Sequence, residues 1–242
     1  MTTKWMVYAK KGEFDKIAQE FHISPVTARV MRNREIREQE EIRKYLYGTR
    51  KDLYSPYMLK DIEKAADILR EKIDQGRRIR IVGDYDIDGV CATYLLFQAL
   101  KRIGAKADYE IPDRIKDGYG INEQIIEAAA GDGVDTILTC DNGISAVAQM
   151  ERAKDLGMTV IITDHHDIAA EDGKDILPRA DAIVNPKQRD CTYPWKEICG
   201  AVVAYKLIQA LLMKAGKEKE ERDSFLEELL PFAALATVCD VM

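Results

Sequence analysis

Beyond residue 78, short apolar segments alternate with longer segments whose apolar residues recur at a helical period. The segments that we expect to form strands lie at 78–83, 105–111, 135–140, 158–163 and 180–184. The helical patterns lie at 91–104, 121–131, 145–157, 201–216 and 224–238. Strands that alternate with helices pair in parallel and carry helices on their faces. The sequence therefore predicts an α/β fold, with a parallel sheet of about five strands and helices on both faces.

The first 77 residues follow a different pattern, in which helices are joined by turns. Helices are expected at 23–34, 36–48 and 53–76, and the first has Ser24 and Pro25 at its start, which is typical of a helix N-terminus. The stretch from Ser24 to Arg34 faintly resembles a helix-turn-helix, a likeness that many short helical pairs share. We therefore expect a small helical region at 1–77 and an α/β domain at 78–242.

Acidic and imidazole side chains follow three of the expected strands and one helical segment. They are Asp84, Asp86 and Asp88 after the first strand, Asp141 after the third, Asp164, His165 and His166 after the fourth, and Asp240 after the last helical pattern. The carboxyl ends of parallel strands meet at one edge of the sheet, where ligands bind. Carboxylates gathered there repel one another and are costly to desolvate. The sequence therefore predicts a compensating positive charge at this edge.

Metal ions fit that requirement. Carboxylate oxygens with imidazole suit Mn²⁺ or Mg²⁺, and Zn²⁺ less well because no thiol is in register. Two ions are expected, since one divalent ion would leave excess negative charge. Taken alone, Asp88 or Asp141 is more simply a helix cap, and His166 a structural histidine. The metal interpretation is favoured because two of the three histidines are adjacent at one of these strand ends.

Charge and cysteine content limit the possible binding partners and cellular location. The net charge of −6 by itself argues against a nucleic-acid partner, but residues 1–80 carry 19 Lys and Arg against 13 Asp and Glu. That basic excess fits part of a DNA channel and ordinary exposed helix faces equally well. No apolar run of membrane-spanning length and no secretory signal are seen. The five scattered cysteines indicate free thiols and a cytoplasmic location.

Four stretches together resemble the motifs of the DHH phosphoesterase superfamily: VGDYDIDGV, CDNGIS, TDHH and LATVCDVM. Within it, the single-stranded-DNA-specific exonucleases are most similar, because IPDRIKDGYGIN and IVNPKQRDCTYPWKEICGAVVAYKL also resemble them. The likeness covers roughly residues 50–242. It implies a metal-dependent phosphodiesterase that removes 5′-mononucleotides from the 5′ end of single-stranded DNA, in DNA repair and recombination.

The resemblance also implies roles for the residues. The implied metal ligands are Asp84, Asp86, Asp88, Asp141, His165 and Asp240. Among them Asp141 bridges two ions, and Asp84 stands where relatives usually have histidine. His166 would point at the scissile phosphate and Asp164 would orient it, so that Asp141, Asp164, His165 and His166 form the catalytic group. Arg114 and Lys116 are candidates for contacts with the DNA.

Other functions stay open at this point. The sequence stops two residues after Asp240, whereas the similar exonucleases continue with further domains, so we expect a fragment truncated before its C-terminal domains. One alternative is a hydrolase of small phosphates, such as pyrophosphate, short oligonucleotides or cyclic dinucleotides. The aspartate at position 84 favours the exonuclease. Another alternative is an inactive fragment or scaffold. The presence of a competent ligand at every motif position argues against this alternative.

Overall fold

A computed structural model describes residue 4 and residues 11–115, 120–216 and 218–242. The chain divides into two compact units, Met1–Leu53 and Tyr54–Met242. Helix α4 (Ile62–Asp74) belongs to the second unit, although it precedes residue 78. The domain division between residues 77 and 78 stays a prediction.

The first unit is built from three short helices, α1 (Phe14–Phe21), α2 (Pro25–Asn33) and α3 (Gln39–Tyr47), followed by the 3₁₀ turn η1 (Arg50–Asp52). Helix α1 was not predicted from the sequence. The core of the unit contains one large side chain from each helix, namely Phe21, Met31 and Ile42. The small helical N-terminal region expected from the sequence is therefore present.

The second unit contains a five-stranded parallel sheet in the order β2-β1-β3-β4-β7. The strands are β1 (Arg78–Val82), β2 (Lys106–Glu110), β3 (Thr136–Cys140), β4 (Thr159–Thr163) and β7 (Ala182–Val184). All five lie within the segments that the sequence predicts as strands, which confirms the predicted fold class. Because the pairing is parallel throughout, the ends of β1, β3 and β4 all open onto the same edge of the sheet.

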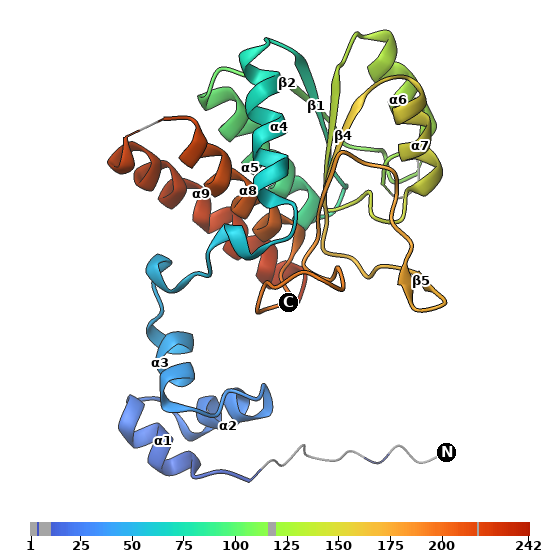
Figure 1. Ribbon diagram of the computed structural model, residues 1–242. Coiled ribbons are helices and arrows are strands. Elements are labelled where there is room, and N and C mark those ends of the chain that lie inside the picture. Colours follow the sequence, from blue (N-terminus) through green and yellow to red (C-terminus); the bar gives the residue numbers. More distant parts are fainter. Residues whose placement is uncertain (1–3, 5–10, 116–119, 217) are drawn as a thin grey trace. The chain divides into compact units, whose positions relative to one another are not determined.

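Helices cover both faces of this sheet (Figure 1). One layer holds α4, α5 (Ile87–Arg102), α8 (Gly200–Lys214) and α9 (Lys219–Cys239), and the other holds α6 (Glu123–Gly131) and α7 (Val147–Asp155). Side chains alternate along the strands, so Ile81 packs into the first layer and Val82 into the second. Two smaller features are the 3₁₀ turn η2 (Pro56–Met58) and a hairpin of β5 (Ala170–Glu171) and β6 (Lys174–Asp175).

Helix α8 lies at the centre of the first layer and carries a buried lysine. Lys206 is only 1% exposed, and its Nζ donates a hydrogen bond of 2.6 Å to the carbonyl oxygen of Tyr54. Burial lowers the pKa of Lys206 to about 8.

None of the helices in the described part of the chain has both the length and the apolar composition of a membrane span.

Candidate metal centre

The turn from β1 into α5 presents the first group of carboxylates. Asp86 is the N-cap of α5, and its Oδ1 accepts a hydrogen bond of 2.9 Å from the amide of Gly89. A Cβ atom at Gly89 would lie 2.5 Å from the carbonyl oxygen of Asp84, so only glycine permits this close approach. The turn leaves Asp86 exposed and buries Asp84 and Asp88.

Asp141 follows β3 in an uncommon backbone conformation. Its φ is 60°, in the left-handed region, which costs energy for a residue with a side chain. The next residue, Asn142, donates hydrogen bonds of 3.0 Å from Nδ2 to the carbonyl oxygens of Val82 and Cys140. The ends of β1 and β3 are thereby tied together beside Asp141, which holds its carboxylate at the edge of the sheet.

Asp164, after β4, organises the two histidines that follow it. Its Oδ1 accepts hydrogen bonds from the amide of His165 at 2.7 Å and from the amide of His166 at 3.1 Å, and it lies 2.7 Å from Nδ1 of His166. Its Oδ2 accepts from the amide of Ile144 at 2.9 Å. The hydrogen bond with Asp164 raises the pKa of His166. Burial opposes ionisation of Asp164, but the bonds from His166 and these amides keep its pKa below the usual value.

His165 lies at the centre of the carboxylates. Its Nε2 is 3.1 Å from Oδ1 of Asp141, 3.5 Å from Oδ2 of Asp88 and 3.7 Å from Oδ2 of Asp240. Asp240 is brought there as the C-terminal cap of α9. One imidazole therefore faces carboxylates from three separate segments of the chain.

The N-terminus of α8 supports this cluster from within the core. The amides of Gly200 and Ala201 donate hydrogen bonds of 2.5 and 2.8 Å to the two oxygens of Asp88. The carboxylate of Asp88 thus accepts two main-chain amides at the end of a helix where negative charge is stabilised. A Cβ atom at Gly200 would lie 2.7 Å from Cβ and Oδ1 of Asp141. Position 200 is therefore packed directly against a second carboxylate.

The protonation preferences of the cluster reflect crowded negative charge with little solvent. Burial raises the pKa of Asp84 and of Asp240. Burial, followed by the charges of Asp88 and Asp86, raises the pKa of Asp141 far above its ordinary value. Burial also lowers the pKa of His165. Without added cations, the cluster is hard to ionise fully.

The donors of the cluster fit divalent cations. They form three groups whose ligand atoms lie within 4.8 Å of one another: Asp141, His165 and His166; Asp88, His165 and Asp240; and Asp84, Asp86 and Asp141. Within the described part of the chain, Nδ1 of His165 is buried and meets no hydrogen-bond partner. Buried polar atoms of this kind are costly unless a ligand satisfies them. Oxygen donors with one or two imidazoles suit Mn²⁺ or Mg²⁺.

Most of the residues predicted from the sequence come together in the structure. Arg114 is not part of the cluster, and Lys116 is not described. All eight acidic and histidine candidates lie at the edge formed by β1, β3 and β4, and their metal and catalytic roles stay predictions. Arg114 is exposed, and its Cζ lies 5.3 Å from the ring centre of Tyr85. In the sequence, Tyr85 stands between the candidate ligands Asp84 and Asp86. Lys116 lies outside the described residues. Asn142 and the amides of Gly200 and Ala201 were not predicted from the sequence, in which CDNG and CGAV are their only signals.

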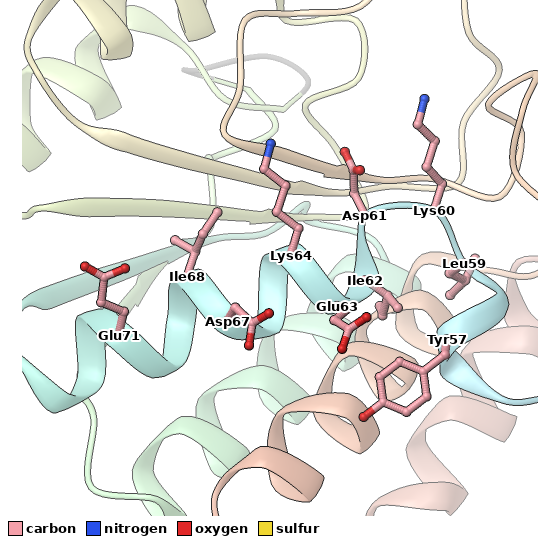
Figure 2. A pocket seen from close by; sticks show the side chains of 10 residues that line it. All are labelled: Tyr57, Leu59, Lys60, Asp61, Ile62, Glu63, Lys64, Asp67, Ile68 and Glu71. Carbon is pink, nitrogen blue, oxygen red and sulfur yellow. The ribbon is translucent and has the colours of Figure 1, made fainter.

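A separate hollow of about 620 Å³ runs along α4 (Figure 2). Its charged lining mixes both signs: Lys60, Lys64, Asp61, Glu63, Asp67 and Glu71. None of the candidate metal ligands lines it, and Lys60 is paired with Asp190 at 2.8 Å. The hollow is therefore not the approach to the carboxylate cluster.

Comparisons with known proteins agree with this geometry. The family described as "DHH family, N-terminal domain" matches residues 78–237. The single-stranded-DNA-specific exonuclease RecJ of Bacillus subtilis is 40% identical over 99% of the chain, and that of Escherichia coli is 36% identical over 99%. The chain spans only 29% and 41% of the lengths of these two relatives.

Solved structures lead to the same group. A crystal structure of exonuclease RecJ bound to manganese has a TM-score of 0.68 and 31% identity, covering 78% of this chain and 45% of that one. RecJ from Thermus thermophilus in complex with Mn²⁺ has a TM-score of 0.69 and 26% identity, covering 95% of this chain and 30% of that one. Both similar proteins were solved with the metal that the donor set here fits.

Proposed function

Because the chain belongs to the DHH family, we propose that it is the catalytic part of a metal-dependent exonuclease, which degrades single-stranded DNA from the 5′ end. The observation that carries the proposal is the three sets of carboxylate and imidazole donors at one edge of the sheet. Asp141 belongs to two of these sets, and His165 also belongs to two. The names of the similar exonucleases supply the substrate class. The chain covers less than half of those relatives, so the activity is assigned to the full-length protein, with roles in DNA repair and recombination.

We assign the metal ligands from the groups of donors. Asp88, His165 and Asp240 would hold one ion, and Asp84 and Asp86 would hold a second. Asp141 shares a group with Asp84 and Asp86, and its Oδ1 lies 3.1 Å from Nε2 of His165, so it would contribute to both ions. Two divalent ions bound there would lower the pKa of an attacking water and neutralise charge on the phosphoryl oxygens. The burial of Asp84 and its place in one group with Asp86 and Asp141 support its inclusion.

His166 is assigned to the substrate phosphate. Its side chain is 42% exposed, whereas that of His165 is only 5% exposed, so His166 is the imidazole that a substrate can reach. Asp164 fixes its ring through Nδ1 and favours the imidazolium, which is suited to binding a non-bridging phosphate oxygen. Asp164 is thus a positioning residue, and it acts on the substrate through His166.

Affinity for DNA must come largely from outside the sheet. Arg114 is a candidate for a phosphate contact, since it stacks on Tyr85, which lies between Asp84 and Asp86 in the sequence. Residues 81–242 carry 17 Lys and Arg against 29 Asp and Glu, and two divalent ions offset about four of the negative charges. A polyanion binds such a surface weakly. Residues 1–242 alone are therefore expected to degrade DNA slowly or not at all.

A labelled-DNA assay tests the proposal. The full-length protein and residues 1–242 are incubated with Mn²⁺ and single-stranded DNA labelled at the 5′ or the 3′ end. The full-length protein should release the 5′ label first, as a mononucleotide, and should spare duplex DNA. Asp141→Asn should abolish release, while Asp155→Asn, an exposed aspartate at the end of α7, should not alter it. Hydrolysis of pyrophosphate or a dinucleotide with DNA left intact would instead identify a small-phosphate hydrolase.

The same proposal assigns the protein to the cytoplasm, where its DNA substrate is found. Four of the five cysteines are free and buried, and Cys239 is free and exposed. Free thiols of this kind are usual in a reducing compartment. Fractionation of the source cells, followed by immunodetection, checks the location.

A further inference from the structure

The first unit contains a helix–turn–helix that plays no part in the metal centre. Helix α1 ends at Phe21, three residues form the turn, and α2 begins at Pro25 (Figure 1). His22 is in the left-handed conformation, with φ 52°, at the position where such turns often have glycine. The amide of Ile23 donates to the carbonyl oxygen of Ala18 at 3.0 Å, which closes the end of α1.

The second helix of this motif has a well-defined start and a buried inner face. Ser24 is its N-cap, and its Oγ accepts a hydrogen bond of 3.0 Å from the amide of Thr27. Ala28 and Met31 face inward and are each 1% exposed. The inner face of α2 is therefore fixed by packing, and the opposite face is turned to solvent.

That outer face combines apolar and basic side chains. Val26 is 70% exposed and Val30 is 46% exposed. The exposed Arg29 and Val30 follow Val26 by three and four residues, the spacings that place side chains on one side of a helix. The guanidinium of Arg29 lies 4.7 Å from the ring centre of Phe14, which limits its motion. From Phe21 to Arg34 the chain has three arginines and no Asp or Glu. We call Val26, Arg29 and Val30 the α2 face.

We propose that the α2 face binds duplex DNA by entering the major groove. A helix of about 10–12 Å diameter fits the B-form groove of about 12 Å width. In helix–turn–helix proteins the second helix occupies this groove and contacts the bases with residues near its N-terminus. In α2, Val26 lies in the first turn, and Arg29 and Val30 lie at the middle of the helix. Arginine pairs with guanine, and valine methyls contact thymine methyls. The absence of acidic residues from Phe21 to Arg34 favours DNA over a protein partner.

This function is separate from the proposed hydrolysis, and it can be tested without metal. Residues 1–242 are titrated against a fluorescent 20-base-pair DNA duplex in EDTA at low salt, and fluorescence anisotropy gives the dissociation constant. Val26→Glu and Arg29→Glu should each raise the dissociation constant about ten-fold or more. Because Arg29 is assigned to a guanine base, Arg29→Glu should also reduce the preference for duplexes that contain guanine over duplexes made of A·T pairs.

Matched variants on α3 separate the α2 face from general charge effects. Tyr45→Glu and Lys44→Glu make the same changes in formal charge at exposed positions of α3, and should alter binding by less than about two-fold. Circular dichroism checks that all four variants keep their helices. Equal losses on both helices, or no duplex binding at low salt, would overturn the proposal.

Competitors identify the nucleic acid. Unlabelled duplex DNA should displace the probe, whereas duplex RNA of the same length should compete poorly, because side chains cannot read its deep, narrow major groove. If duplex RNA or single-stranded DNA competed as well as duplex DNA, insertion into the major groove would be ruled out. Failure of hydrolysis in the assay above would leave this result unchanged, because no catalysis enters the binding measurement.

Discussion

The amide of Gly200 lies 2.5 Å from Oδ2 of Asp88, although 112 residues separate them in the chain. The same glycine packs against Asp141, where a Cβ atom would come within 2.7 Å of the carboxylate. Two of the assigned metal ligands are therefore positioned by the first turn of α8. The backbone of a buried helix therefore helps to fix both carboxylates.

Gly200→Ala should weaken Mn²⁺ binding by about 10- to 100-fold, because Asp141 must move to make room for the new methyl group. Isothermal calorimetry on residues 1–242 measures the affinity. Gly131→Ala is a suitable control, since no atom lies within 4 Å of the added Cβ and its φ is not positive. Equal Mn²⁺ affinities for the two variants would show that the contact with Asp141 does not set the site.

Mn²⁺ should raise the melting temperature of residues 1–242, because binding relieves repulsion among buried carboxylates and stabilises only the folded state. At about 100 times the dissociation constant the expected shift is about 5–10 °C. Differential scanning calorimetry with and without Mn²⁺ measures it. Asp141→Asn should remove most of the shift, and Asp155→Asn should keep it. An unshifted wild-type transition at millimolar Mn²⁺ would argue against a preformed site.

The pKa of His166 in the metal-free chain should lie above the usual histidine value, because Asp164 accepts a hydrogen bond from its ring. A raised pKa means that this contribution to stability is complete below the unfolded-state pKa and is lost as pH rises through the folded-state pKa. NMR titration in EDTA follows the imidazole directly. Asp164→Asn should lower the pKa of His166. The same pKa in both proteins would mean that Asp164 does not hold the proton.

Lys206 should make the free energy of unfolding increase with pH in alkaline solution. Its pKa is lowered to about 8 by burial, so between about pH 8 and 10.5 the unfolded chain binds more protons than the folded one. The increase is about 3 kcal/mol at most. Urea unfolding at several pH values compares wild type with Lys206→Met, which should lack this increase. Parallel pH profiles for the two proteins would contradict a lowered lysine pKa.

The sheet and the gathering of acidic groups could be predicted because both depend on local pattern. Runs such as 135–140 and 158–163 are short, rich in apolar and β-branched residues and bounded by polar ones, which is typical of buried strands, and residues that follow such strands share one edge. Cap identity was harder to predict. Asp86, not Asp88, caps α5, which begins at Ile87 instead of residue 91, because Asp88 turns inward to accept amides from α8.

Contacts between distant segments could not be predicted at all. The closeness of Gly200 to Asp141 depends on how α8 packs beneath the sheet, and spacing in the sequence has no information about that distance. Helix α1 was missed because it is a short, largely polar segment, and only Ala18 and Phe21 are buried in it. Its stability comes from packing with the rest of its unit, which a local pattern does not reveal.

The strand order β2-β1-β3-β4-β7 also creates the opening in which the cluster lies. From β1 the chain moves outward to β2 through α5 on one face, and then returns past β1 to β3 through α6 on the opposite face. Adjacent strands whose connections diverge in this way form a topological switch point, with a crevice above their ends. Asp84 and Asp141 stand on its two sides. Selection can therefore exchange ligands at this crevice, and with them the reaction, without redesigning either hydrophobic layer.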